Sequence, residues 1–197
     1  MKLCFSKVRF VKSATKKEEF LFDKPVFTFI GRSNVGKSTL INRLVQQKGF
    51  RKTSKTAGRT NRVNYALIDE KIYLADVPGY GFATFERDSF SPRRKSFLEE
   101  NRALKKVYIL IDSRRLLRPA DDSFMDYLER LKIPFAAVFT KRDKLKSSEK
   151  ELVKEQEEKI LPYESFEVSL KDEKGIIALR KDREKERTEK GLFKNLG

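Results

Sequence analysis

The chain has 197 residues, 39% hydrophobic and 38% charged, which is a length that fills one hydrophobic core. It has no histidine and a single cysteine, which excludes a Ser-His triad, a histidine-ligated metal site and an intrachain disulfide. Lys and Arg outnumber Asp and Glu by 16 (45 against 29), and no segment approaches the roughly 20 apolar residues that span a bilayer. We therefore expect a monomeric cytoplasmic domain over residues 1–197, without membrane contact, whose positive surface attracts a polyanion, nucleic acid above all.

Apolar runs alternate with amphipathic stretches along the chain, which is the pattern of a βαβ protein. The predicted strands cover residues 26–30, 63–69, 71–77, 106–112, 135–140 and 165–169. Helices are predicted from Lys37, over 92–104, from Pro119, from a capping box at Ser148 and Glu151, and from Lys174. Residues 1–20 are expected to be an N-terminal extension, and residues 181–197 a charged C-terminal tail whose first part is a solvated helix or frayed.

The connections between the predicted strands define the fold class. Strands 63–69 and 71–77 are almost contiguous, so they must form an antiparallel hairpin, whereas helical crossovers make the other strands parallel. We expect a three-layer α/β fold with a mixed six-stranded sheet, one antiparallel strand and helices on both faces. Ligands of such sheets bind at the carboxyl ends of the strands, so the loops after Ile30, Asp76 and Thr140 should share one rim.

A glycine-rich segment lies between the first predicted strand and the first predicted helix. It reads Gly31-Arg32-Ser33-Asn34-Val35-Gly36-Lys37-Ser38 and matches the P-loop pattern G-x-x-x-x-G-K-[ST] in full. The glycines let backbone N–H groups wrap around phosphate oxygens, and the N-terminus of the following helix adds partial positive charge. Lys37 is expected to reach the β- and γ-phosphates, and the Ser38 hydroxyl to ligate Mg²⁺. The segment predicts a nucleotide site rather than a simple glycine turn.

A second motif, Asp76-Val77-Pro78-Gly79, ends the third predicted strand. An aspartate at this place can hold Mg²⁺ through water, and a glycine N–H can meet the γ-phosphate. The pattern D-x-x-G is weak by itself, because Pro-Gly is a common turn. About 40 residues after a P-loop it strengthens the prediction of a P-loop NTPase fold of the Ras-like type.

A third motif, Thr140-Lys141-Arg142-Asp143, closes the fifth predicted strand. The Asp143 carboxylate can accept hydrogen bonds from N1–H and the 2-amino group of guanine, a pair of donors that adenine does not present. Lys141 can lie along the base, and Ser169, after the last predicted strand, can support the Asp143 side of the pocket. These residues favour guanine over adenine, with a plain charged loop as the alternative.

These motifs together resemble the EngB family of bacterial GTPases. The resemblance also includes Ser54-Lys55-Thr56-Ala57-Gly58-Arg59-Thr60 and Tyr80-Gly81, and it extends from about Cys4 to Arg180. It implies GTP hydrolysis with Mg²⁺ and a role in assembly of the large ribosomal subunit. The chain departs from the family at Ala57, where proline is usual, at Asn61, where glutamine is usual, and at Glu167-Val168-Ser169, which makes the alignment of Ser169 less secure.

The polar and basic stretch 52–64 is predicted to be the first switch loop, which orders around Mg²⁺ and the γ-phosphate and relaxes on hydrolysis. The resemblance assigns Thr60 as its Mg²⁺ ligand, with Thr56 as the rival, and includes Gly58 and Arg59 among the nucleotide-binding residues. Tyr80 stands where a Ras-like enzyme has a water-positioning glutamine, so we expect slow intrinsic hydrolysis.

Asn34 is a candidate for assisting hydrolysis, because relatives with asparagine at this P-loop position bind K⁺ beside the phosphates. A loop residue that bonds its own backbone is an equal alternative for Asn34. Arg32 and Arg59 could act as internal arginine fingers, although surface charge is the simpler interpretation for both.

Clusters of basic residues suggest phosphate contacts to ribosomal RNA, with a merely solvated surface as the alternative. The clusters are Arg51, Lys52, Lys55, Arg59 and Arg62; Arg93, Arg94 and Lys95; and Arg114, Arg115 and Arg118. Two other functions compete: a GTPase that signals to a protein or a membrane, and a passive RNA-binding protein with a vestigial P-loop. Intact Lys37, Ser38 and Asp76 argue against the passive protein, and the net charge argues against a partner that is only protein.

Overall fold

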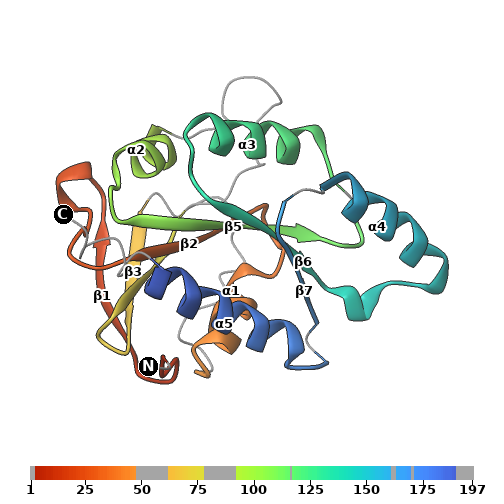
Figure 1. The fold of residues 1–197 in the computed structure, drawn as a ribbon, viewed down its shortest axis with the longest axis horizontal. Helices are drawn as coiled ribbons and strands as arrows, with labels where there is room; N and C mark the ends of the chain where they lie inside the picture. Colours follow the sequence, from red (N-terminus) through yellow and green to blue (C-terminus); the bar gives the residue numbers. More distant parts are fainter. Residues whose placement is uncertain are drawn as a thin grey trace.

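The computed structural model of the chain describes residues 3–47, 62–77, 92–115, 117–160, 163–169 and 171–189, and its described part is built around one mixed sheet (Figure 1). The strands are β1 (Val8–Ala14), β2 (Val26–Gly31), β3 (Val63–Ile68), β4 (Ile72–Asp76), β5 (Leu104–Asp112), β6 (Phe135–Thr140) and β7 (Ser165–Val168). The helices are α1 (Lys37–Leu44), α2 (Pro92–Glu100), α3 (Pro119–Arg130), α4 (Ser147–Ile160) and α5 (Lys174–Glu189), with short 3₁₀ turns at Lys17–Glu19 and Arg142–Lys144.

The strands lie in the order β1-β3-β4-β2-β5-β6-β7, and β3 alone runs against the others. The expected single antiparallel strand is confirmed, but the expected six strands are seven. The additional strand, β1, comes from the segment expected to be an N-terminal extension, and it pairs Val8 with Ile68 and Ala14 with Val63. A bulge between Phe10 and Lys12 breaks the two-residue alternation, and Phe10 is exposed, so the apolar pattern of this edge strand is weak in sequence.

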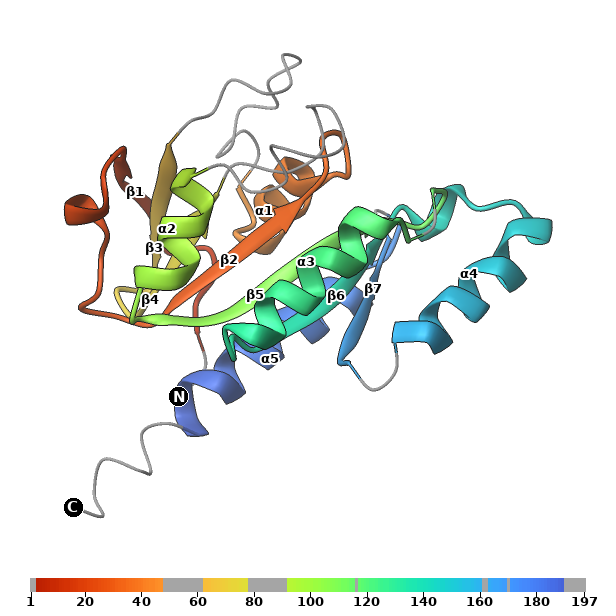
Figure 2. The same cartoon turned by 90° about the horizontal axis from the view of Figure 1, so that it is seen from above.

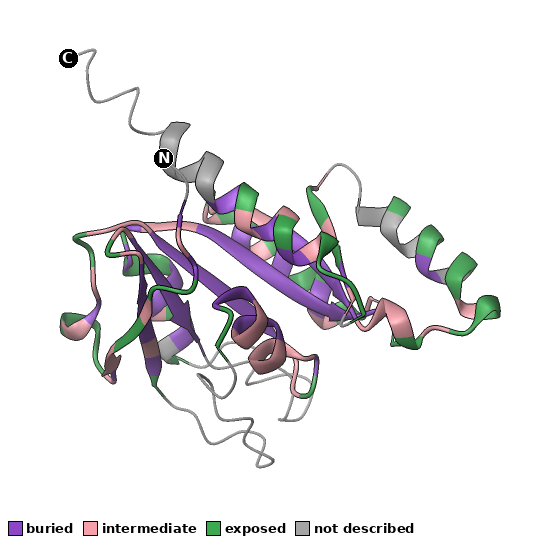
Figure 3. Cartoon of the chain, turned by 90° about the horizontal axis from the view of Figure 1, so that it is seen from below, coloured by how far each residue is buried: buried purple, intermediate pink, exposed green. Residues whose placement is uncertain are grey.

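Helices cover both faces of the sheet (Figure 2), and most strand residues are buried (Figure 3). A hydrophobic cluster lies on each face. On the central strand β2, Val26 and Ile30 belong to the cluster that includes residues of α2 and α3, whereas Phe27 and Phe29 belong to the cluster that includes residues of α1 and α5. Successive side chains of a strand alternate between faces, so a strand covered on both faces is apolar throughout. This places β2 in the middle of the molecule and holds its carboxyl end rigidly.

Two helix boundaries differ from the predicted ones. α2 ends at Glu100, because the Asn101 side chain accepts the Ala103 N–H at 3.1 Å and turns the chain into β5. α4 begins at Ser147, because the Glu149 carboxylate accepts the backbone N–H of Lys146 at 2.7 Å, which moves the capping interaction two residues ahead of the predicted box. α1, α3 and α5 begin at their predicted residues.

The segment expected to be a charged tail is helical as far as Glu189, and its first charges are buried. Asp182 accepts hydrogen bonds from Lys106 Nζ at 3.0 Å and from the Tyr108 hydroxyl at 2.6 Å. The Arg183 guanidinium lies over the rings of Phe5, Phe29 and Tyr108, 5.0–5.5 Å from their centroids. The start of this segment is therefore part of the core rather than a solvated end.

Candidate functional site

The P-loop connects β2 to α1 through a backbone that only particular residues tolerate. Gly36 has φ 101° and Asn34 has φ 62°, both in the left-handed region that glycine and asparagine adopt most readily. A Cβ on Gly31 would lie 2.8 Å from the Leu110 Cβ, so a side chain here would push the loop away from β5. No side chain caps the N-terminus of α1, whose cap residue is Gly36. Its first N–H groups are therefore left for another acceptor, as anion binding requires.

Lys37 links the P-loop to the end of β4. Its ammonium lies 2.9 Å from Asp76 Oδ1 and donates to the Val77 carbonyl at 2.5 Å. Asp76 is only 4% exposed, so its carboxylate is held at a fixed position beside the loop. The first two motifs, separated by about 40 residues of sequence, thus meet at one edge of the sheet.

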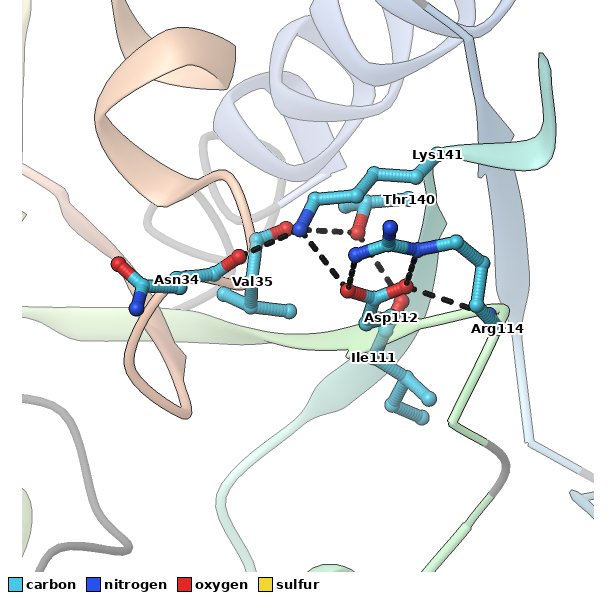
Figure 4. Close-up of polar contacts among 7 residues, drawn as sticks. All are labelled: Asn34, Val35, Ile111, Asp112, Arg114, Thr140 and Lys141. Carbon is cyan, nitrogen blue, oxygen red and sulfur yellow. Dashed lines mark hydrogen bonds and ion pairs between the residues drawn. The ribbon is translucent and has the colours of Figure 1, made fainter. Parts of the chain in front are cut away.

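Lys141, which has φ 62°, joins the third motif to the P-loop from the other side (Figure 4). Its ammonium donates to the Asn34 carbonyl at 2.5 Å and to Asp112 Oδ2 at 2.8 Å. The Thr140 hydroxyl donates to the Val35 carbonyl at 2.7 Å. The end of β6 is therefore tied to two successive P-loop carbonyls.

Asp112, at the end of β5, anchors this group of residues. Arg114 donates to both of its oxygens, at 3.0 and 2.8 Å, while Lys141 approaches one of them (Figure 4). Burial alone would raise the pKa of Asp112, but the hydrogen bonds from Arg114 and Lys141 outweigh it and lower that pKa. The carboxylate is consequently charged at neutral pH.

Asp143 lies in the 3₁₀ turn after β6, and the Ser169 hydroxyl is 3.4 Å from its Oδ1. The neighbouring Arg142 donates to Glu167 at 2.5 Å, which ties this turn to β7. The structure thus brings Ser169 beside Asp143 despite the unusual residues before it, at a separation that is long for an O–H···O hydrogen bond.

The predicted site residues fall into two groups. The structure places the first group in the P-loop, at the last residues of β4 and β6, or directly after β4, β6 and β7: Gly31, Arg32, Ser33, Asn34, Val35, Gly36, Lys37, Ser38, Asp76, Val77, Thr140, Lys141, Asp143 and Ser169. Gly58, Arg59, Thr60, Pro78 and Gly79, with the rival Thr56, lie outside the described residues. Asp112 was missed, although an acid at the carboxyl end of a parallel strand beside a P-loop strand is a signal that could have found it.

The basic clusters are less uniform than their sequence suggests. Arg94 is 2% exposed and faces the interior, so it cannot contact RNA from the surface. Lys95 lies 3.9 Å from Glu99, and Arg114 is paired with Asp112. Among the described residues of the last cluster, Arg115 and Arg118 remain exposed and unpaired.

Within the described ranges, no group of three or more His, Cys, Asp or Glu residues could hold a metal ion. The donors at the P-loop, the Ser38 hydroxyl and the Asp76 carboxylate, are oxygen atoms of the kind Mg²⁺ prefers, and Mg²⁺ in such sites completes its shell with phosphate oxygens and water. No described helix is both long and apolar enough to cross a membrane.

Comparison with known proteins identifies the family. Residues 26–141 match the family described as 50S ribosome-binding GTPase. The chain is 45% identical over 131 residues to the probable GTP-binding protein EngB of Aquifex aeolicus, covering 64% of this chain and 71% of that protein. It is 38% identical over 149 residues to the Chlorobaculum tepidum relative of the same description, covering 74% and 78%.

A solved structure agrees with these relatives. The crystal structure of a probable GTP-binding protein engB superimposes with a TM-score of 0.61 at 25% identity, covering 83% of this chain and 99% of that one. The fold, the P-loop that joins β2 to α1 and the sequence similarity point the same way, and the chain belongs to the EngB family of GTP-binding proteins, a family of GTPases.

Proposed function

We propose that this GTPase is a single, monomeric G domain of the cytoplasm that acts as a nucleotide-dependent switch in assembly of the large ribosomal subunit. The observation that carries the ribosomal part is the match of residues 26–141 to a family described as 50S ribosome-binding, in a chain with a net charge of +16. Contacts between basic side chains and RNA phosphates would supply the affinity.

The triphosphate of GTP would lie in the P-loop. Backbone N–H groups of residues 31–38 would donate to its oxygens, assisted by the uncapped N-terminus of α1. Lys37 would exchange its contacts with Asp76 and Val77 for the β- and γ-phosphates, since all of these partners offer oxygen acceptors. Gly79 would donate to the γ-phosphate, and Gly58 and Arg59 would complete the switch side of the site.

Magnesium fits the donors at this edge of the sheet. Ser38 would ligate the ion directly, Asp76 would hold its water shell, and Thr60 would join when the switch loop orders. The ion supplies neutralisation of the charge on the phosphate oxygens. Asp76 is suited to this role because it is buried and held at a fixed position beside the P-loop.

The guanine base would be read by Asp143, with Ser169 behind it and Lys141 along the base plane. The contacts of Lys141 with the Asn34 carbonyl and Asp112 keep its side chain extended across the P-loop, which supports this placement. Thr140 contributes by holding the Val35 carbonyl and so the relative position of base and phosphate sites.

We also propose that K⁺ assists hydrolysis at Asn34, which would offer its amide oxygen beside the phosphates. Asn34→Gly is the sharper variant here, because glycine keeps φ 62° without strain and removes only the amide. Wild type should turn over GTP faster in K⁺ than in Na⁺ at matched ionic strength, and the variant should not. Equal wild-type rates in the two salts would contradict a role for K⁺.

The ribosomal function is tested by co-sedimentation with large ribosomal subunits in GDP and in a non-hydrolysable GTP analogue. We expect binding in the GTP-analogue state that exceeds binding in GDP. Lys37→Ala is the control, because loss of its ammonium should abolish the nucleotide dependence. A wild type that sediments with no ribosomal particle in either state would show that the switch reports to a protein or membrane partner instead.

A further inference from the structure

A small concavity lies beside the P-loop, between the end of β5 and the start of α3. Its polar lining comes from Arg32 and Ser33 of the P-loop, Asp112 of β5, Arg115 and Arg118 of the following loop, and Asp121 of α3. Val35, Leu110 and Ile111 form its apolar part. None of the residues assigned to the guanine base lines it, so it is distinct from the base pocket.

The two acids of this concavity are already engaged. Asp112 is paired with Arg114 and Lys141. Asp121, which is 2% exposed, accepts the backbone N–H of Arg118 at 3.0 Å at the first turn of α3, where the helix dipole favours a negative charge. The Asp112 charge is therefore taken up by Arg114 and Lys141, which leaves the single charge of Asp121 against the three arginines of the lining.

The three arginines that line the concavity have no ion pair or side-chain hydrogen bond within the described part of the chain, unlike Arg9, Arg43 and Arg142, which each have an acidic partner. Arg115 and Arg118 are exposed, and Arg32 is half-buried. The lining residues and the two partners of Asp112 together carry an excess of three positive charges. The five cations are Arg32, Arg114, Arg115, Arg118 and Lys141, and the two carboxylates are Asp112 and Asp121.

Guanidinium groups that converge without acidic partners suit a phosphate group. The planar fork of arginine donates two parallel hydrogen bonds to a phosphate, which a lysine ammonium cannot do. Because two of the arginines are on the surface, the phosphate can belong to a large polyanion.

From these contacts we propose that Arg32, Arg115 and Arg118 form a docking pocket for a backbone phosphate of ribosomal RNA. The proposal rests on the proposed ribosomal function and gives it a site. Arg32 and Ser33 line this pocket and also belong to the P-loop. RNA docked here touches the wall of the nucleotide site directly, without an intervening element.

The test uses the full chain saturated with GDP and Mg²⁺. The P-loop is then occupied and cannot bind RNA phosphates itself. The variant Arg115→Gln/Arg118→Gln removes two guanidinium groups from residues that are not themselves assigned to nucleotide binding. Lys150→Gln/Lys154→Gln on the exposed side of α4 is the matched control, since it removes the same charge elsewhere. Binding to large ribosomal subunits and to a short RNA hairpin is measured across a KCl series.

We expect the arginine variant to bind both RNAs about tenfold or more weakly, with a salt slope smaller by about two, while the control stays within about twofold of wild type. GDP affinity and melting temperature should be unchanged in both variants. Equal losses in the two variants, or none in the arginine variant, would overturn the pocket. A third outcome separates the two proposals. If the wild type binds the hairpin but no ribosomal subunit, and the arginine variant loses hairpin binding, the pocket is supported and the ribosomal function is rejected.

Discussion

Asp112 holds Lys141 on one side while the Asn34 carbonyl holds it on the other, so a residue outside the sequence motifs sets the position of one inside them. The two contacts differ in kind, because the carboxylate attracts the ammonium over a distance and the carbonyl directs one hydrogen bond. We therefore expect Asp112 to act on the nucleotide through Lys141.

Asp112→Asn should weaken GDP binding about tenfold, because an amide holds the Lys141 ammonium less strongly than a carboxylate. If it acts through Lys141, it should have no further effect in a Lys141→Ala background, which a double-mutant cycle on the GDP dissociation constant measures. Additive effects in the cycle, or a parallel loss of melting temperature that accounts for the whole change, would show a structural role instead.

The lowered pKa of Asp112 decides how its contribution to stability and binding depends on pH. Because the pKa of Asp112 is lowered in the folded chain, the carboxylate stabilises the fold above its unfolded pKa of about 3.9, and that stabilisation is lost as pH falls through the lower folded value. Between pH 5 and 8 its charge is constant, so the ratio of the wild-type and Asp112→Asn affinities should not change across this range.

Asp143→Asn should shift nucleotide preference from guanine towards xanthine, because the amide donates to the 2-oxo group where the carboxylate accepted from the 2-amino group. Asparagine has nearly the same shape as aspartate, so the substituted side chain still lies beside Ser169. Titration with GDP and xanthosine diphosphate measures the preference, and weak ATP binding by both proteins is the control. An unchanged GDP affinity would remove Asp143 from the base pocket.

At the level of single residues, contiguous motifs were predictable and contacts between distant segments were not. Lys37, Asp76, Thr140 and Lys141 are in patterns whose spacing reflects the geometry of a phosphate or a base. Asp112 has no such pattern, since its partner Lys141 is brought near it only by the pairing of β5 with β6. The burial of Arg94 could not be predicted either. Arg94 stands between two other basic residues in the sequence, so nothing in the local pattern marks it as part of the buried face of α2.

Among the elements, those with strong periodicity or a clear first residue were predicted best. α3 begins at Pro119 and β2 follows its apolar run, because local preference and tertiary burial agree there. β1 was missed, because it is an edge strand with a bulge and several polar side chains. Only one of its seven residues is fully buried, so it has no clear apolar alternation. The end of α5 could not be decided, because its charged residues look solvated until the aromatic rings that cover Arg183 are known.

The burial of Asp182 and Arg183 leads to a prediction about α5. A chain that ends after Arg180 should lose on the order of 3–5 kcal/mol of unfolding free energy, because Lys106 loses a buried partner and three rings lose their cover. A chain that ends after Lys190 keeps α5 as far as Glu189, with the contacts of Asp182 and Arg183, and should therefore keep the stability that these contacts supply. Urea denaturation of the three chains measures the difference, and equal midpoints would show that α5 beyond Arg180 is dispensable.

Across the whole molecule, rigid and variable parts are arranged around one rim. The P-loop is held by the ends of β4, β5 and β6 through Asp76, Asp112 and Thr140. The predicted first switch loop is connected to this rim through β3, and it contains basic residues. We expect that loop to carry its cations into order when the γ-phosphate is bound, so that the nucleotide governs the presentation of charge.

The last prediction concerns that coupling. Lys55, Arg59 and Arg62 belong to the loop that Thr60 is expected to order around Mg²⁺ and the γ-phosphate, and an ordered loop presents its cations without a further loss of conformational entropy. GTP should therefore raise affinity for large ribosomal subunits, and a difference of about 1.4 kcal/mol would give a tenfold preference. Thr60→Ala should still bind nucleotide, since the P-loop and Asp143 are intact, but should lose this preference. The measurement is the affinity of both proteins for the subunits in GDP and in a GTP analogue across a salt series. Equal wild-type affinities in the two states would mean that something other than the ribosome senses the γ-phosphate.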